Sequence, residues 1–356
     1  MTILLVRPRL IGDVILTTPA IRALKRRFPD ASLLYLVESL AAPVVADNPH
    51  LSEVLVIERR RGWRRWLEDL RLAQRLRRRR VEIAVDFHGG PRSAWLTWAT
   101  RARMRVGYDV ADRRWMYTHV VPKPRGYAPR HSVQNQWDLL APIDDAFRTP
   151  PDRTADRVEM PVSATTREAV AARLAGMGLA PADRLVIVHV TAGNEFRRWP
   201  AASFARVVAL LTQRGRDWPV LVLGGAGDDA IVSEVVRTAR AQSNDAARIL
   251  PVVGWPLGHV RALMDRAALF VGGDSGPMHM AATTDIPIVA IFGPTMPATW
   301  APWRPPQLPL ATIDTDGLAC RPCDQRVCEP GDFRCLRQID PQTVVDAAGR
   351  LLEASR

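Results

Sequence analysis

The chain has 356 residues, which predicts two domains rather than one, and a formal net charge of +12, which predicts attraction to anionic surfaces. Its composition, with 47% hydrophobic and 24% charged residues, excludes a disordered or fibrous protein. It contains no apolar run long enough to span a membrane, and Arg7, Arg9 and Asp13 interrupt the N-terminal apolar stretch, so we expect a cytoplasmic protein without a signal peptide.

Short apolar strands alternate with helical patterns along both halves of the chain. Strands are predicted at 3–6, 32–37, 53–56, 82–86, 185–190, 219–223, 269–271 and 288–292, and helices at 14–27, 201–214, 228–241 and 257–266. This alternation indicates parallel sheets with crossover helices. Residues 142–162 are rich in Pro, Asp, Thr and Arg and are predicted to form a linker. We expect an α/β fold with two doubly wound, Rossmann-like domains, 1–160 and 161–356, facing each other across a cleft.

The loop 7–13 follows the first predicted strand and places an acid near the start of the next helix. Gly12 permits a backbone shape that a larger residue would resist, and Pro19 predicts that the helix starts late or kinks. Asp13 has two interpretations of equal weight at this point. It can cap the helix and complement its dipole, or it can act as a general base.

A basic amphipathic segment covers residues 59–80, where arginines surround an apolar side that includes Trp63, Trp66 and Leu76. Tryptophan in such a helix is typical of elements that lie on a membrane surface. The alternative is an ordinary surface helix in an arginine-rich chain. Arginine with tryptophan also suits nucleic acid, but no nucleic-acid fold signature accompanies the segment, so we expect no nucleic-acid partner.

The segment 189–200 has the residues for phosphate binding. It leaves a predicted strand, and Thr191 with the backbone of Gly193 could cradle a phosphate. Arg197 could supply positive charge and a fork of N–H donors. Because the chain uses arginine almost everywhere, only its position after a strand singles Arg197 out.

Two glycine-rich turns follow later strands. The first ends in acids, of which Asp228 could hydrogen-bond a ribose or cap a helix. The second, within 271–279, presents Asp274 as a carboxylate for sugar hydroxyls and Ser275 as a hydroxyl for phosphate. A helix is predicted to begin near Pro277. The alternative to ligand binding is a tight strand-to-helix connection in which the aspartate or the serine caps the helix.

All four cysteines lie close together, as Cys320, Cys323, Cys328 and Cys335. Zinc ligands often begin with such a Cys-x2-Cys pair, but the later spacings match no common zinc finger. Reduced thiols are the equal alternative, since a reducing compartment disfavours disulfides. Either state is expected to be structural, because the segment is not near the other motifs in sequence.

Taken together, these motifs resemble the heptosyltransferases of lipopolysaccharide core synthesis, which form glycosyltransferase family 9 and have the GT-B fold. The matching pieces are 10–13 with 17–19, 191–199, 224–228 and 273–279, and they span nearly the whole chain in the right order. Within the family, the chain is most similar to the branch that adds the second or third core heptose. The resemblance implies an N-terminal acceptor-binding domain and a C-terminal nucleotide-sugar-binding domain.

The resemblance also implies roles for individual residues. Asp13 matches the family's proposed catalytic base. The implied donor-binding residues are Thr191, Arg197, Asp228, Trp255, Asp274, Ser275, Gly276 and His279, and the candidates for acceptor contacts are Arg9, Gly12, His88 and Arg92. Arg197 stands where the family usually has a lysine, so its fork and reach differ. Trp255 lies where the family holds the adenine ring, on which it could stack.

The implied reaction moves heptose from ADP-heptose to the inner core of a lipid A–core precursor at the cytoplasmic surface of the inner membrane. Asp13 would take the acceptor proton, fixed cations and N–H groups would stabilise the leaving diphosphate, and direct displacement would invert the anomeric centre. We expect no catalytic metal and no required cofactor. The alternatives are a different nucleotide sugar, or a noncatalytic basic protein that binds nucleic acid or a membrane surface.

Overall fold

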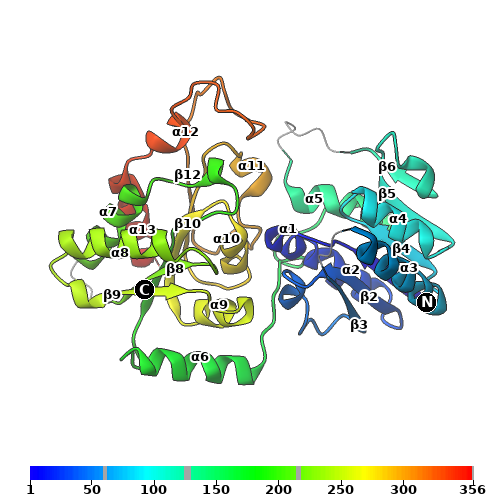
Figure 1. Ribbon diagram of the computed structural model, residues 1–356, viewed down its shortest axis with the longest axis horizontal. Helices are drawn as coiled ribbons and strands as arrows, with labels where there is room; N and C mark the ends of the chain where they lie inside the picture. Colours follow the sequence, from blue (N-terminus) through cyan, green and yellow to red (C-terminus); the bar gives the residue numbers. More distant parts are fainter. Residues whose placement is uncertain (59–61, 124–129, 214–217, 355–356) are drawn as a thin grey trace. The chain divides into compact units, whose positions relative to one another are not determined.

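Figure 1 shows the computed structural model, which describes residues 1–58, 62–123, 130–213 and 218–354. The start of the predicted basic segment, at 59–61, and the last residue of the helix predicted at 201–214 lie outside these ranges. The chain divides into two compact units, which we call unit 1 (Met1–Pro161) and unit 2 (Val162–Arg356).

Unit 1 is a parallel six-stranded sheet with the strand order β3-β2-β1-β4-β5-β6. The strands are β1 (Thr2–Val6), β2 (Ser32–Glu38), β3 (Glu53–Ile57), β4 (Ile83–Asp86), β5 (Met104–Tyr108) and β6 (His119–Val121). The helices are α1 (Ile11–Ile15), α2 (Thr18–Arg27), α3 (Gly62–Arg78), α4 (Pro91–Ala99) and α5 (Ser132–Trp137), with short 3-10 turns η1 (Ala42–Val44), η2 (Arg114–Met116), η3 (Asp138–Leu140) and η4 (Asp145–Arg148).

Unit 2 repeats this plan with the order β12-β11-β10-β7-β8-β9, again all parallel. Its strands are β7 (Leu185–His189), β8 (Val220–Gly224), β9 (Ile249–Val253), β10 (Ala267–Gly273), β11 (Ile288–Ile291) and β12 (Leu310–Ile313). Its helices are α6 (Ala164–Gly176), α7 (Ala201–Gln213), α8 (Asp229–Gln242), α9 (Leu257–Met264), α10 (Gly276–Ala281), α11 (Pro297–Trp300), α12 (Arg334–Arg337) and α13 (Pro341–Ala354), with 3-10 turns η5 (Glu195–Arg197) and η6 (Ala246–Arg248).

In each unit the fourth strand in chain order lies beside the first, which is the Rossmann-like, doubly wound order. The central strands are buried along their whole length, as in β7 and β8, because helices cover both faces of the sheet (Figure 1). The predicted fold class is therefore confirmed for both units.

The sequence pattern found the central strands and missed β5, β6, β9 and β12. Three of these, β6, β9 and β12, lie at sheet edges, where burial is incomplete and the apolar pattern is weak. β9 also contains Pro251, which is tolerated at an edge because no ladder hydrogen bond is needed there. The helix predicted at 14–27 is divided into α1 and α2, and Pro19 lies in the first turn of α2, as predicted.

The basic helix α3 packs on the sheet with only part of its apolar side. Leu72 and Leu76, in its C-terminal half, are buried in the core of unit 1. In its N-terminal half, Trp63 and Trp66 are 70% and 66% exposed. Packing therefore explains one half of the amphipathic pattern and leaves the other half on the surface. Among the described residues, no helix combines the length and hydropathy needed to cross a bilayer.

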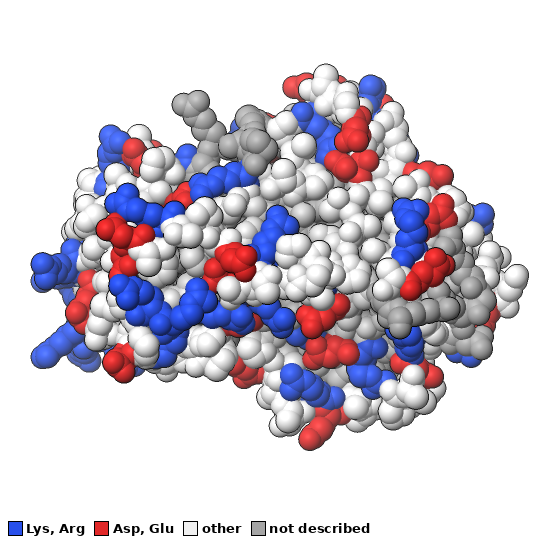
Figure 2. Space-filling view, turned by 180° about the vertical axis from the view of Figure 1, so that it is seen from behind, with Lys and Arg blue, Asp and Glu red and all other residues white. Residues whose placement is uncertain are grey.

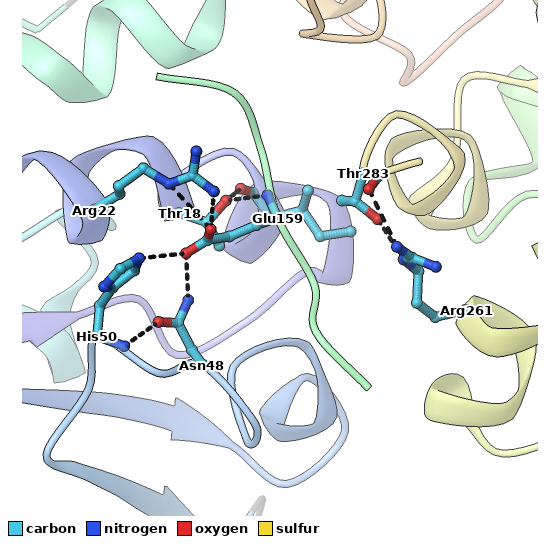
Figure 3. Close-up of polar contacts among 8 residues, drawn as sticks. Thr18, Arg22, Asn48, His50, Glu159, Arg261 and Thr283 are labelled. Carbon is cyan, nitrogen blue, oxygen red and sulfur yellow. Dashed lines mark hydrogen bonds and ion pairs between the residues drawn. The ribbon is translucent and has the colours of Figure 1, made fainter. Parts of the chain in front are cut away.

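The segment predicted as a linker, 142–162, is fastened to unit 1 through Glu159 (Figure 3). The carboxylate of Glu159 accepts hydrogen bonds from Arg22 Nε at 3.1 Å and from Asn48 Nδ2 at 2.9 Å. Its backbone N–H donates to Thr18 Oγ1 at 2.9 Å. The segment up to Pro161 thus belongs to unit 1, because α2 and the loop after η1 supply donors for a buried acid.

A second buried polar tie, also drawn in Figure 3, lies in unit 2. Arg261 of α9 donates through Nε to Thr283 Oγ1 at 2.6 Å, and its Nη1 lies 2.5 Å from Asp265 Oδ1. Thr283 comes just after α10, so this arginine joins α9 to the end of the helix that follows β10. This contact fixes the C-terminal end of α10 on α9.

Replacing Glu159 with alanine should destabilise unit 1. The substitution leaves the donors of Arg22 and Asn48 without their partner, and the loss of a largely buried charged acceptor costs about 2–3 kcal/mol in the free energy of unfolding. Urea unfolding of the two proteins measures the difference. Glu58→Ala, at an exposed site in the same unit, should change it by less than about 0.5 kcal/mol; equal effects of the two substitutions would contradict the assignment.

Candidate functional site

Most of the predicted functional residues lie at the carboxyl ends of the strands, and several lie where the strand order reverses. In unit 1 this point is between β1 and β4, which are neighbours, and it carries Asp13 and His88. In unit 2 it is between β7 and β10, and it carries Thr191 and Asp274. Ligands of doubly wound sheets bind at such switch points, because the helices that follow the two strands leave on opposite faces.

Asp13 is held in the loop after β1 by an arginine. Its carboxylate is 9% exposed, and its Oδ2 lies 2.5 Å from Arg7 Nη2. The same guanidinium donates through Nη1 to the carbonyl of Phe87 at 2.6 Å, so it ties the loops after β1 and β4 together. The unusual backbone predicted at Gly12 falls instead on Leu10, whose φ is 69°, while Gly12 is an ordinary residue of α1.

His88 lies in the loop after β4, beside the same charges. Burial, together with the positive charges of Arg7 and Arg9, lowers the pKa of His88 to about 4, so its imidazole is neutral at pH 7. The loop is shaped by Asp86, which accepts hydrogen bonds from the His88 N–H at 2.9 Å and the Tyr117 hydroxyl at 2.7 Å. Burial raises the pKa of Asp86, and the hydrogen bonds that its carboxylate accepts act in the opposite direction. Arg9 itself is exposed.

Arg92 does not join this group. Its Nη2 donates to Asp69 of α3 at 2.7 Å, and its Nη1 lies 3.8 Å from Glu38. The guanidinium therefore fastens α4 to α3. This contact is structural, and the predicted acceptor contact of Arg92 stays a prediction.

Four neighbouring strands of unit 2 each contribute to the predicted donor site. In the sheet order β10-β7-β8-β9, these strands are followed in turn by Asp274, Thr191, Asp228 and Trp255. Residues that are up to 83 positions apart in sequence are thus brought to one edge of one sheet. The predicted start of a helix near Pro277 is confirmed, since α10 begins at Gly276.

A chain of hydrogen bonds joins the central strand ends of this row. Thr191 Oγ1 donates to Asp228 Oδ2 at 2.8 Å and lies 3.2 Å from His189 Nε2. Since the one hydroxyl proton goes to the carboxylate, Nε2 must carry the imidazole proton and donate to Thr191. Nδ1 of the same ring is then an acceptor 3.3 Å from Ser275 Oγ, whose hydroxyl proton also has the Gly273 carbonyl as an acceptor, at 3.1 Å. His189 thereby orients both hydroxyls that are predicted to contact phosphate.

His189 can do this because it stays neutral. The ring is buried at the end of β7, and burial lowers its pKa to about 4, with the nearby Asp228 acting in the opposite direction. A neutral imidazole has one donor and one acceptor nitrogen, which is what the two hydroxyls require. The segment 189–200 was singled out from sequence, but no pattern assigned a role to this histidine.

Asp274 is the most enclosed acid of the row, at 3% exposure. Its Oδ2 lies 3.1 Å from Arg197 Nη1, and its Oδ1 lies 3.8 Å from His279 Nε2. Within the described residues, Oδ2 accepts no hydrogen bond of good geometry despite this ion pair. A buried carboxylate oxygen with remaining acceptor capacity suits a ligand hydroxyl. The structure thus brings Asp274, Arg197 and His279 together, three of the residues predicted to bind the donor.

Trp255 follows β9 at the end of the row. The N–H of Gly254 donates to the carbonyl of Gly224 at 3.2 Å, which joins this turn to the one after β8. Gly224 is required there, because a Cβ atom would lie 2.6 Å from Val232 Cγ2. The half-buried indole has the guanidinium of Arg173 over one face, 5.1 Å from the ring centroid. Its predicted contact with adenine stays a prediction.

The cysteine segment lies next to the loop of Arg197, although the distance in sequence had suggested otherwise. Gln325 Oε1 accepts a hydrogen bond from Arg197 Nε at 2.7 Å, and the rings of Phe333 and Phe196 are 5.4 Å apart. The expectation that this segment stands away from the other motifs is therefore wrong. No sequence signal pointed to Gln325, because only the fold brings it to the end of β7.

The four cysteines are free thiols, and burial raises the pKa of Cys335. Thiols are suitable zinc ligands, but no three His, Cys, Asp or Glu side chains in the described ranges are arranged to hold a metal ion. The structure therefore does not supply a fitting zinc site. Structural zinc and reduced thiols both stay predictions.

An Asp-x-Asp pattern, which is typical of metal-dependent transferases, is present at Asp314 and Asp316. It follows the edge strand β12. Asp314 Oδ2 lies 3.0 Å from Arg321 Nη2, so this acid has a cationic partner within the protein. The pattern is thus at the margin of the sheet and not at the switch point.

Two doubly wound units of this kind define the GT-B class of glycosyltransferase folds. The model of glycosyltransferase family 9 (heptosyltransferase) matches residues 69–330. The chain belongs to this family and is a glycosyltransferase, so the predicted family and enzyme class are confirmed and the noncatalytic alternative is not supported.

Individual relatives agree with this assignment. Lipopolysaccharide heptosyltransferase 3 of Escherichia coli is 27% identical over 354 residues, which are 97% of each chain. The crystal structure of a family 9 glycosyltransferase from Veillonella parvula has a TM-score of 0.86 at 23% identity, over 99% of this chain and 97% of that one. The structure of E. coli ADP-heptose LPS heptosyltransferase II has a TM-score of 0.77 at 21% identity, over 100% and 99%.

Unit 2 should lose stability as the pH falls below 6.5. Unfolded histidine has a pKa near 6.5, whereas that of His189 is about 4, so the unfolded chain binds the proton first. The contribution is fully present above pH 6.5 and is lost toward pH 4, and it amounts to about 2 kcal/mol between pH 8 and pH 5.

Urea unfolding at both pH values tests this in the wild type and in His189→Gln. The comparison separates His189 from His88, whose pKa is also low. His119→Gln, at an exposed position on β6, should keep the wild-type pH dependence. If His189→Gln keeps it as well, the assignment of a buried neutral histidine is wrong.

Proposed function

We propose that this glycosyltransferase moves a heptose from ADP-heptose to the inner core of a lipopolysaccharide precursor. The relatives named above, heptosyltransferases 3 and II, support the donor and the acceptor. The observation that carries the proposal is the row of Asp274, Thr191 and Asp228 at neighbouring strand ends, with Arg197 beside Asp274. This set offers acceptors for sugar and ribose hydroxyls next to hydroxyl and guanidinium donors for a diphosphate.

The donor side of the reaction needs a stabilised leaving group. Breaking the anomeric bond places negative charge on the departing diphosphate and positive charge on the sugar. Arg197, the oriented hydroxyls of Thr191 and Ser275 and the N–H groups of the turns stabilise that negative charge. Asp274 binds hydroxyls of the sugar, and Trp255 stacks on the adenine. A guanidinium and fixed dipoles carry out this work in the proposed mechanism, which needs no metal.

On the acceptor side, Asp13 is the proposed general base. Its carboxylate is held at a fixed place by Arg7 and takes the proton of the attacking hydroxyl as the new bond forms. Attack opposite the leaving group inverts the anomeric carbon in a single displacement. Arg9, Gly12 and His88 surround the same loop ends and are proposed to contact the acceptor. Unit 1 is thus the proposed acceptor-binding unit, and unit 2 the donor-binding unit.

Asp13→Asn should abolish most transfer without preventing donor binding. The amide keeps the size of the side chain but cannot accept the proton, so kcat should fall by about 10³-fold. The assay is transfer from ADP-heptose to a lipid A–Kdo core acceptor, with ADP binding followed by calorimetry.

The matched control is Asp112→Asn, at an exposed site of the same unit, which should behave as the wild type. Wild-type rates in Asp13→Asn would exclude the base assignment. A wild-type protein that transfers no heptose and binds no ADP would instead exclude the donor, and another nucleotide sugar would then be the leading candidate.

We also propose that the enzyme works at the cytoplasmic surface of the inner membrane, docked through an aromatic surface on unit 1. This surface comprises Trp63, Trp66, Trp95, Trp98 and Trp115, from α3, α4 and η2. Trp66 and Trp95 have ring centroids 6.5 Å apart, and those of Trp98 and Trp115 are 5.9 Å apart. Trp98 and Trp115 are 39% and 61% exposed.

Basic side chains accompany this aromatic surface. Arg65, Arg71 and Arg75 are exposed on α3. On the face of the molecule seen in Figure 2, lysine and arginine gather over the part that belongs to unit 1. Exposed tryptophans beside arginines suit the interface of an anionic bilayer, where indole rings enter the headgroup region and guanidinium groups meet phosphate. Because the lipid A precursor lies in such a bilayer, docking through this surface would bring the enzyme to its proposed acceptor.

Vesicle co-sedimentation tests this surface. The wild type should bind vesicles that contain phosphatidylglycerol, and bind them less well at high salt, and it should bind pure phosphatidylcholine weakly. The double variant Trp66→Ser, Trp98→Ser should lose about tenfold or more in partitioning, because two exposed indoles are removed. Leu40→Ser, at an exposed apolar site in the same unit, is the control. Unchanged binding by the double variant would rule out the aromatic surface as the docking site.

A further inference from the structure

One amide connects the cysteine segment, residues 320–335, to the guanidinium of the donor site. Gln325 Oε1 accepts two hydrogen bonds, from Arg197 Nε at 2.7 Å and from Asn194 Nδ2 at 3.1 Å. At its other end, the guanidinium of Arg197 lies 3.1 Å from Asp274 Oδ2. Arg197 is therefore held from two sides, by a neutral acceptor and by an acid.

We propose that Gln325 is a positioning residue for the diphosphate of the donor, acting through Arg197. The inference rests on the proposed donor site and extends it to a residue outside the motifs of the sequence. A guanidinium has five N–H donors, of which Gln325 engages the Nε–H, while Asp274 is an ion-pair partner of Nη1. The remaining donors point from a fixed plane, so an arriving anion does not have to order a mobile side chain.

The charge of the partner matters as much as its geometry. Asp274 already places one negative charge beside Arg197. A second acid at position 325 would compete with the diphosphate for the same cation, whereas the amide oxygen of Gln325 fixes Nε and leaves the positive charge available. A neutral acceptor is therefore the partner that positions the arginine at the least cost to anion binding.

The cysteine segment places this amide. Gln325 has a left-handed backbone, with φ 60°, and its N–H donates to Cys323 Sγ at 3.3 Å. The N–H of Cys323 donates in turn to the carbonyl of Pro294, just after β11, at 3.3 Å. The contact between Phe333 and Phe196 fastens the same segment to the loop of Arg197. The segment is thus anchored on both sides of the position that Gln325 occupies.

Two substitutions separate the acceptor from the charge. Gln325→Met is similar in size and removes the acceptor, and it should weaken ADP binding by about tenfold and lower kcat for transfer, because Arg197 is no longer fixed. Gln325→Glu keeps the acceptor but adds a negative charge, and it should weaken ADP binding by about tenfold as well. Adenosine, which has no phosphate, should bind both variants within about twofold of the wild type.

The experiment is calorimetry with ADP and adenosine on the full chain, alongside heptose transfer and thermal melting. Gln342→Met is the matched control: it removes a glutamine on α13 that hydrogen-bonds Asp346 in the same unit, and it should change neither affinity. Wild-type ADP affinity in both Gln325 variants, or an equal loss for ADP and adenosine, would overturn the positioning role. A wild-type protein that does not bind ADP would overturn the proposed function, and this inference with it.

Discussion

The reversal of strand order in each sheet is the constraint on which the rest of the structure depends. Parallel strands place all their carboxyl ends at one edge, and the reversal sends the helices after β7 and β10 to opposite faces. Short turns at this edge can then approach a ligand without a helix in the way. Asp274, Thr191 and Asp228 lie together for this reason, and Asp13 and His88 occupy the equivalent place in unit 1.

At the proposed donor site, neutral side chains hold the groups that would contact the diphosphate. His189 is kept neutral by burial, so that it orients Thr191 and Ser275 without adding a positive charge. Gln325 holds Arg197 without cancelling its charge. A site that must stabilise a diphosphate as it leaves benefits from fixed dipoles around a single available cation, since such groups need no reorganisation during the reaction. An arginine suits this arrangement, because a planar fork can be held from two sides.

In unit 1, arginines near the candidate site residues are engaged in structural contacts. Arg7 links Asp13 to the loop after β4, and Arg92 is committed to the contact between α3 and α4. The exposed half of α3 has no such explanation within the fold, because the leucines that α3 buries in the core, Leu72 and Leu76, lie in its C-terminal half. The proposed membrane surface accounts for the tryptophans that packing leaves outside. We therefore propose acceptor recognition at the loop ends near Asp13, and surface docking through α3, α4 and η2.

The sequence by itself determined the fold class, the central strands and the family, because buried parallel strands are continuous apolar runs and the site turns are local motifs. It also singled out Asp13, Thr191, Arg197, Asp228 and Asp274 as candidate site residues, since each follows a recognisable strand. Only the tertiary structure decided which of these residues meet, and it added His189, Arg7 and Gln325. Their roles depend on burial and on contacts across as many as 128 positions, which no local pattern encodes. Three of the four edge strands, β6, β9 and β12, escaped prediction because incomplete burial leaves a weak apolar signal.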